Sequence, residues 1–141
     1  MKWYKSSLSI PTRGKGLYAF NDKINAQLRA WNVKEGMCFL FCPHTSASLT
    51  INENYDPSAQ ADLETSLEKL VPENQGWYTH DMEGPDDATS HIRAMLTESS
   101  LSIPVDEGRL TLGTWQGVYL FEHRTRSHQR EVWLRVMDVT A

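Results

Sequence analysis

A chain of 141 residues is long enough for one sizeable core, and we predict a single domain over residues 1–141. Its hydrophobic content of 40% and charged content of 23% are ordinary for a globular protein, and a net charge of −4 argues against nucleic-acid binding, which usually needs a basic field. No apolar run approaches the length of a bilayer span, and the first residues lack a signal-peptide core. We therefore expect a cytoplasmic protein with neither nucleic acid nor membrane as a partner.

The N-terminal part of the chain is predicted to form a strand and a helix. A loose alternation of side chains indicates a strand over residues 2–10, which Pro11 should end because proline has no N–H to donate. Asn21 or Asp22 can cap a helix that runs to about Trp31 and carries its apolar residues on one face.

Residues 37–42 are apolar without a break and predict a strand. Such a run is typical of a strand buried on both faces, or of one that faces a core on one side and another subunit on the other. Its cysteines, Cys38 and Cys42, share one face and are predicted to be buried free thiols. A second strand is predicted over residues 47–53, and the polar residues after Pro43 should lie at the mouth of a buried sheet.

Two helices joined by a long polar loop are predicted in the middle of the chain. Asp56 and Pro57 form a good helix start, and an apolar stripe continues to Val71. Residues 72–87 form a loop whose length indicates either function or disorder, and its aromatic side chains favour order. The next helix should turn three apolar side chains inward: Ile92, Met95 and Leu96.

The C-terminal part of the chain is predicted to be β structure. Strands are predicted over residues 101–105, 110–112, 115–122 and 131–139, with a tight turn at residues 106–108. Helices and strands do not alternate regularly along the whole chain. The sequence therefore predicts an α+β fold, with a mostly antiparallel sheet and about three helices.

Three histidines from separate predicted elements, His44, His80 and His91, lie beside hydroxyls or carboxylates in the sequence. Neutral imidazoles with nearby carboxylates suit a borderline-soft divalent ion, most often zinc. For each of these three residues, metal ligation and an ordinary hydrogen-bonded role stay equally open at this point. For His128 the ordinary role is preferred. Asp87 and His91 are four residues apart and share a helix face.

A second group of polar residues lies near a glycine in the C-terminal part. Thr114, Gln116, His123 and Arg124 supply hydroxyl, amide, imidazole and guanidinium groups, several of them the donors that a phosphate needs. Trp115 can stack on a flat heterocycle, although packing is the commoner role of tryptophan. No base is placed beside the serines of residues 46–48, so covalent catalysis is not predicted.

In three motifs the chain resembles the YjbQ-like family. The first contains His44 to Thr50, Asn52 to Asn54 and Asp56-Pro57; the second runs from His80-Asp81 to Ile92; the third runs from Ser100 to Arg124 and includes Gly113 to Gly117. The resemblance implies a sandwich-like α+β domain that assembles as a homotrimer. Some family members are described as secondary thiamine-phosphate synthases, which join hydroxymethylpyrimidine diphosphate to thiazole phosphate and release diphosphate. A metal-assisted transferase with a phosphorylated small-molecule substrate is therefore implied.

The resemblance also implies a set of site residues. A divalent ion, zinc or magnesium, would be held by His44, His80 and His91. The catalytic groups would be Glu53, Asp87 and Arg124, with Arg124 neutralising the departing diphosphate. The substrate would contact Thr45, Ser46, Thr114, Trp115, Gln116 and His123. Two alternatives stay open: a metal-dependent hydrolase of a phosphorylated or amide small molecule, and a non-catalytic trimeric protein that binds a metal or metabolite.

Overall fold

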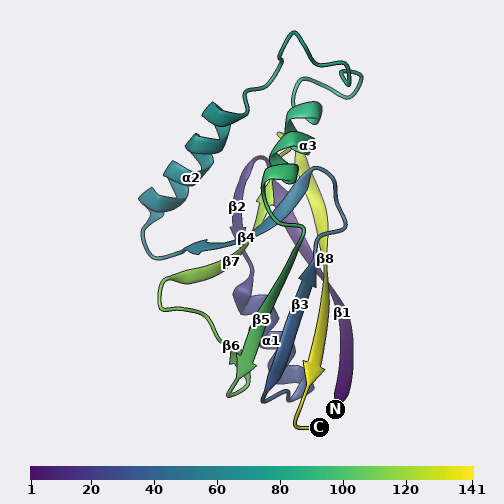
Figure 1. Cartoon of the computed structure of the whole chain (residues 1–141), viewed down its shortest axis with the longest axis vertical. Helices are drawn as coiled ribbons and strands as arrows, with labels where there is room; N and C mark the ends of the chain where they lie inside the picture. The colour runs from purple at the N-terminus through teal and green to yellow at the C-terminus, as the bar shows by residue number, and fades with distance from the viewer.

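A computed structural model describes residues 1–141 as an α+β fold of eight strands and three helices, which confirms the predicted class (Figure 1). The elements in chain order are β1 (Lys2–Arg13), β2 (Gly16–Ala19), α1 (Asn21–Trp31), β3 (Gly36–Phe41), β4 (Ala47–Glu53), α2 (Pro57–Leu70), α3 (Asp87–Leu96), β5 (Ser100–Asp106), β6 (Arg109–Leu110), β7 (Gln116–Glu122) and β8 (Ser127–Asp138).

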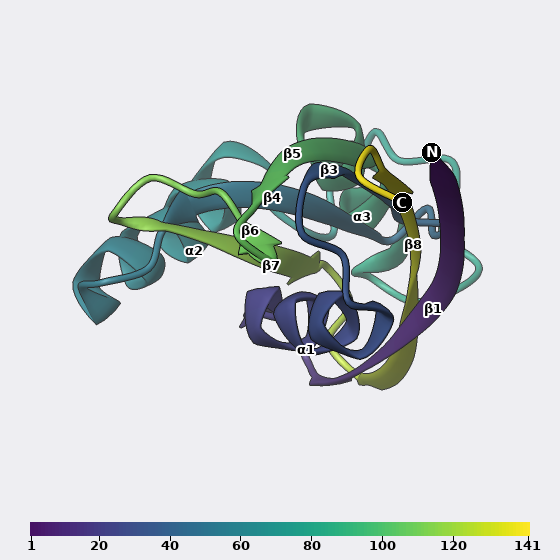
Figure 2. The same ribbon diagram turned by 90° about the horizontal axis from the view of Figure 1, so that it is seen from below.

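The strands form two antiparallel sheets. The larger has the order β1-β8-β3-β5-β6 and the smaller the order β2-β7-β4. The predicted strand over residues 47–53 is β4: Ala47 and Leu49 belong to the main core, and Ser48, on the opposite face, is also buried and contacts Thr97. The main core fills the space between the sheets and is closed by α1, which lies inside the curve of the strands in Figure 2. Of the 18 buried residues in this core, half come from the inward-facing positions of β3, β5, β7 and β8.

The apolar strand β3 has one buried face and one face open to solvent. Cys38 and Leu40 point into the core, and Cys38 is a free thiol whose pKa burial raises to about 12. Phe41 lies on the opposite face, 44% exposed, and stacks on Trp133 of β8 with ring centroids 5.6 Å apart. Of the two interpretations of this run, a strand buried on both faces is therefore wrong within one chain.

The strand β1 is longer than predicted because it continues through Pro11 to Arg13. It lies at the edge of the larger sheet, where a proline can direct its missing N–H away from the ladder. The strand β8 likewise begins at Ser127, four residues before the predicted start, because it pairs with the extended end of β1.

Helices α2 and α3 lie over the face of the smaller sheet that points away from the main core (Figure 1). Asp56 caps α2 as predicted, accepting a hydrogen bond from the N–H of Ser58 at 2.9 Å. For α1 the N-cap is Phe20 rather than Asn21 or Asp22.

The predicted inward face of α3 is wrong for two residues, since Met95 and Leu96 are 75% and 53% exposed. The helix buries four polar side chains instead: Asp87, Thr89, Ser90 and Arg93. Among the helices of this fold, none combines the length and the apolarity that a membrane crossing requires.

Candidate functional site

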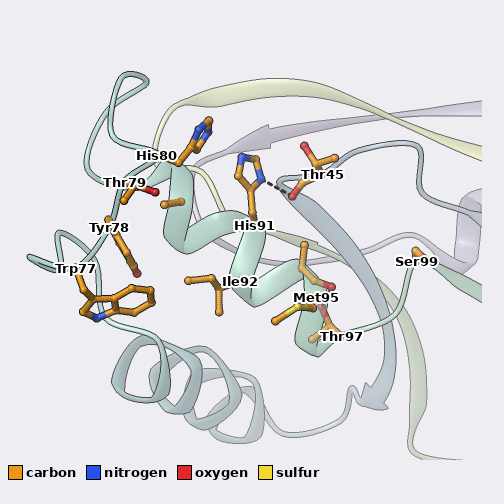
Figure 3. Close-up of a pocket in the computed structure, with 12 residues that line it drawn as sticks. Thr45, Trp77, Tyr78, Thr79, His80, His91, Ile92, Met95, Thr97 and Ser99 are labelled. Carbon is orange, nitrogen blue, oxygen red and sulfur yellow. Dashed lines mark hydrogen bonds between the residues drawn. The ribbon is translucent and has the colours of Figure 1, made fainter.

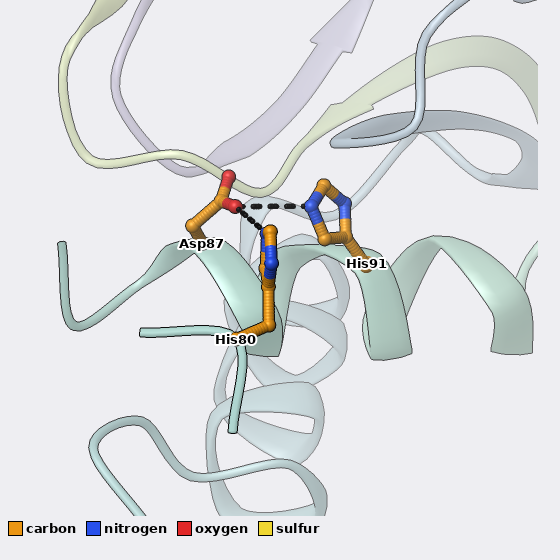
Figure 4. Close-up of side chains that lie close together, drawn as sticks. All are labelled: His80, Asp87 and His91. Carbon is orange, nitrogen blue, oxygen red and sulfur yellow. Dashed lines mark hydrogen bonds and ion pairs between the residues drawn. The ribbon is translucent and has the colours of Figure 1, made fainter. Parts of the chain in front are cut away.

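Three ligand-type side chains meet where the long loop enters α3, at the end of the molecule opposite the two termini (Figures 1 and 4). The Nε2 atom of His80 lies 2.7 Å from Oδ2 of Asp87, and Nε2 of His91 lies 3.0 Å from the same oxygen. One ligand atom from each residue lies within 4.8 Å of the other two. Asp87 and His91 meet because they are one helical turn apart, and the loop brings in His80.

The protonation of His91 is set by its second nitrogen. Its Nδ1 lies 2.8 Å from the carbonyl oxygen of Thr45, and because a carbonyl can only accept, Nδ1 carries the proton and donates. In the neutral ring, Nε2 then offers a lone pair to the carboxylate oxygen of Asp87. Two lone pairs at 3.0 Å repel unless a cation, either a proton or a metal ion, lies between them.

Arg124 holds the other oxygen of Asp87. Its NH1 donates to Oδ1 at 2.6 Å, and its Nε donates to Oδ2 of Asp86 at 3.1 Å. Burial would by itself raise the pKa of Asp87, but the hydrogen bond with His80 and the charges of His91 and Arg124 hold that pKa below its ordinary value. The carboxylate is therefore ionised and oriented, with Oδ2 directed at the two imidazoles.

Asp86 fixes the segment that carries Arg124. Its Oδ2 also accepts from the N–H of Thr125 at 2.8 Å. Burial alone would raise the pKa of Asp86, but the bonds from Thr125 and Arg124 outweigh it and lower that pKa. Asp86 is the N-cap residue of α3, but its carboxylate makes no capping bond to the helix and binds the segment that follows β7 instead.

A pocket of about 800 Å³ opens beside the three ligand groups (Figure 3). His80, His91, Thr45 and Thr79 lie at its polar end. Its other end is formed by four apolar or aromatic side chains from the loop and α3: Trp77, Tyr78, Ile92 and Met95. The long loop therefore forms one wall of the pocket.

A buried ion pair supports the segment that contacts His91. Arg130 binds Glu122, and its NH2 donates to Oγ of Ser46 at 2.9 Å, next to the Thr45 carbonyl. Burial would raise the pKa of Glu122, but Arg130 and the Thr12 hydroxyl hold it below its ordinary value. Ser46, predicted to contact substrate, here positions the backbone of the site.

His123 is buried beneath α3 and does not line the pocket. Its Nε2 lies 2.8 Å from Oγ of Ser48, and the hydroxyl of Thr97 lies 2.5 Å from the same oxygen. The Nδ1 atom of His123 has no hydrogen-bond partner. Because an orphaned buried N–H is rare, we assign the proton to Nε2, which donates to Ser48. Burial lowers the pKa of His123 to about 3, helped by the charge of Arg93, so the ring is neutral.

His44 lies apart from the other two predicted ligands. Its Nε2 accepts from the N–H of Glu131 at 3.0 Å and is 3.1 Å from the carbonyl oxygen of the same residue. Burial lowers the pKa of His44, and the charge of Arg130 lowers it further. The expected set of three histidines is therefore not gathered within one chain, because His44 pairs with the backbone of β8. Asp87 completes the cluster in its place.

Four other predicted site residues lie at the far end of the smaller sheet. The register pairs Ala47 with Glu122 at the near end and Glu53 with Gln116 at the far end, a separation of about 20 Å along the strand. Glu53 accepts from the N–H groups of Tyr55 and Asp56, both at 3.1 Å. The other three have no contact with the cluster: Thr114, Trp115 and Gln116 are exposed in the β6–β7 loop and at the start of β7.

Several residues of the site were not predicted from the sequence. Met95 and Thr97 line the pocket, and Arg130 and Ser48 hold its framework. The four-residue spacing of Asp87 and His91 was a usable signal for shared ligation, whereas the apolar character of Met95 pointed to the core. Nothing in the local sequence around residues 128–133 signals the pairing of His44 with β8.

Comparison with known proteins relates the chain to a single protein family. The family model described as "UPF0047 protein YjbQ-like" matches residues 6–139. The UPF0047 protein sll1880 of Synechocystis is 51% identical over 133 residues, covering 94% of this chain and 90% of that protein. The UPF0047 protein YjbQ of Salmonella typhimurium is 43% identical over 131 residues, covering 92% and 94% of the two chains.

Solved structures give the same picture. The conserved hypothetical protein TT1486 from Thermus thermophilus superposes with a TM-score of 0.85 at 34% identity and covers 94% of this chain and 99% of its own. An uncharacterised protein of the YjbQ/UPF0047 family from Clostridium acetobutylicum superposes with a TM-score of 0.81 at 34% identity, covering 95% and 99%. A shared fold does not determine which reaction a protein catalyses; that depends on the side chains of its site.

Proposed function

This chain belongs to the UPF0047 family of YjbQ-like proteins, and we propose that it binds a divalent metal ion through His80, Asp87 and His91 and hydrolyses a small molecule in the adjoining pocket. The observation that carries the proposal is that Nε2 of His80 and Nε2 of His91 both face Oδ2 of Asp87, at 2.7 Å and 3.0 Å, while Nδ1 of His91 is engaged by the Thr45 carbonyl. A metal ion accepts lone pairs from all three facing atoms at once.

The chemistry of the donors favours zinc over magnesium. Two imidazole nitrogens and one carboxylate oxygen suit a borderline-soft ion, whereas magnesium prefers oxygen ligands and water. Three protein ligands are also the number found in catalytic zinc sites, which keep a position for water or substrate. When bound, such an ion supplies a water that is activated as a nucleophile near neutral pH.

The residues around the three ligands orient them. The Thr45 carbonyl selects the tautomer of His91 that leaves Nε2 free, and Arg124 fixes Oδ1 of Asp87 so that Oδ2 is directed toward the imidazoles. Thr45 is held in turn through Ser46 by Arg130. These contacts preorganise the site without help from the ion.

Zinc titration by calorimetry tests the proposal. Protein dialysed against a chelator is expected to bind one zinc ion per chain, and His91→Ala is expected to lose that binding. His128→Ala is the matched control, because His128 does not belong to the cluster. Zinc-dependent turnover of a hydrolysis library that disappears in His91→Ala completes the test.

The transferase expected from the family resemblance receives less support within one chain. Arg124 is already paired with Asp86 and Asp87, and Thr114, Trp115 and Gln116 lie about 20 Å away along the sheet. A condensation of two phosphorylated precursors would need these groups to come from a neighbouring subunit. Formation of thiamine phosphate by the zinc-loaded protein, lost in Trp115→Ala, would favour the transferase over the hydrolase.

Self-association is the second part of the proposal. The open face of the larger sheet carries Trp3, Phe41 and Trp133, which are 50%, 44% and 38% exposed. An exposed aromatic face on a sheet marks an interaction surface. We assign it to further copies of the chain, as a homotrimer.

A further inference from the structure

The pocket beside the proposed metal ligands has two unlike ends, and the contrast bears on what it binds. Near the cluster it is lined by His80, His91 and threonine hydroxyls. Farther away, Trp77, Ile92 and Met95 form an apolar wall (Figure 3). A volume of about 800 Å³ suits a small organic molecule rather than a water or an ion.

No lysine or arginine lines this pocket. Two guanidinium groups on or in contact with α3, those of Arg93 and Arg124, are already engaged. Arg124 is paired with Asp86 and Asp87, and the buried Arg93 donates to the carbonyl oxygen of Val71 at 2.8 Å. The first turn of α3, where a helix would otherwise favour an anion, carries the carboxylate of Asp87. A phosphate therefore finds no free cationic side chain among the residues that line this pocket.

The charge count at the cluster leads to the same conclusion. Asp86, Asp87 and Arg124 together leave one negative charge, and a divalent ion brings the site to one positive charge. A neutral carbonyl or a single carboxylate matches that balance, whereas a phosphate monoester or a diphosphate exceeds it.

We infer that the pocket takes a small molecule with an aromatic or alkyl body and a carboxylic ester or amide head, and that phosphorylated compounds are poor ligands. This inference rests on the proposed hydrolase function. The head would lie at the His80–His91 end and the body against Trp77 and Met95. In the reaction the oxygen of water joins the carbonyl carbon, the bond to the leaving oxygen or nitrogen breaks, and the leaving group takes up one proton of the water.

The test uses the zinc-loaded full chain and two probes of similar size, 3-phenylpropanoate as the product-like carboxylate and phenyl phosphate as the phosphate. Calorimetry should give tighter binding of 3-phenylpropanoate, by about ten-fold. Trp77→Ala should weaken that binding by about ten-fold because it removes one aromatic wall. Trp115→Ala is the matched control, an exposed tryptophan at the far end of the smaller sheet, and should leave binding unchanged.

Zinc affinity is measured first for each variant, so that two failures can be told apart. If zinc binds but phenyl phosphate is the tighter ligand, or Trp77→Ala binds 3-phenylpropanoate as well as the wild type does, the inference is overturned while the metal site stands. If the wild-type protein binds no zinc, the proposed function is wrong, and the inferred class of ligand is wrong as well.

Discussion

Arg124 is the residue that determines how Asp87 is presented to the two imidazoles. Its guanidinium donates to both Asp86 and Asp87, a fork geometry that lysine cannot reproduce. Arg124 therefore orients Asp87, which is one of the proposed metal ligands.

Replacing Arg124 by lysine should weaken zinc binding by about 10- to 100-fold, the usual effect of losing a group that orients a metal ligand. The reason is that Asp87 would keep a nearby positive charge but lose its fixed Oδ1. Competition titration with a zinc indicator measures the change. Arg126→Lys, an exposed neighbour, is the control and should match the wild type. Equal zinc affinity in Arg124→Lys and the wild type would show that the orientation of Asp87 is unimportant.

Glu122 is fully buried and binds Arg130, so its removal leaves a buried positive charge without a partner. Glu122→Gln should lower the free energy of unfolding by about 3 kcal/mol at pH 7. The folded-state pKa of Glu122 is lowered, so its contribution to stability is present above the ordinary pKa near 4.5 and is lost as the pH falls through the lower, folded-state value.

Urea unfolding between pH 7 and pH 3 checks the direction of this pH dependence. The difference in the free energy of unfolding between the wild type and Glu122→Gln should narrow on acidification. The reason is that the wild type loses the stabilisation of the Glu122–Arg130 ion pair, which the variant lacks at every pH. A difference that widens toward pH 3 would contradict the assignment of Glu122 as an ionised partner of Arg130.

At the scale of elements, α3 is tied to the smaller sheet by hydroxyls and an imidazole rather than by an apolar face. Thr97 at its end contacts Ser48 of β4, and Ser48 contacts His123 just after β7. The tie holds the helix that carries Asp87 and His91 at a fixed place over the sheet.

A double-mutant cycle measures this tie. Ser48→Ala alone should destabilise the fold by about 1–3 kcal/mol, because it leaves the buried N–H of His123 unpaired. Adding His123→Phe removes the unpaired group, so the double variant should lose about 1 kcal/mol less than the sum of the two single losses. Strict additivity in urea unfolding would mean that the Ser48–His123 contact contributes nothing.

Helices and strands were predictable from the sequence where their position depends on neighbouring residues alone. The alternation in β4 and the Asp56-Pro57 start of α2 follow from the period of a strand and from helix capping. The inward face of α3 was predictable only for Ile92, which packs against the second hydrophobic cluster. Met95 lines the pocket instead, and the buried positions of the helix are filled by polar groups that find partners only after folding.

The site was predictable in its chemistry but not in its grouping. His80, Asp87 and His91 lie within 12 residues of one another, and a helical spacing already joins two of them. His44 and Glu53 belong to the same predicted motif, yet β4 separates them by about 20 Å. The pairing of His44 with β8 depends on sheet order, which no local pattern encodes.

At the scale of the whole molecule, the open aromatic face of the larger sheet predicts assembly. Light scattering should give a mass three times the 16.1 kDa of one chain. Phe41→Asp should shift the protein toward single chains, because a charge would be buried in the interface without a partner. Trp115→Asp places the same charge at an exposed aromatic position outside that face and should keep the wild-type mass. A wild-type mass equal to one chain would refute the trimer.

The central claim is that His80, Asp87 and His91 form one metal site, and zinc stoichiometry of the chelator-treated chain tests it most directly. We predict one ion per chain in the wild type and none in His80→Ala/His91→Ala, while His44→Ala keeps its zinc because His44 binds the backbone of Glu131. A wild type that takes up no zinc, or a double variant that retains it, would contradict the account.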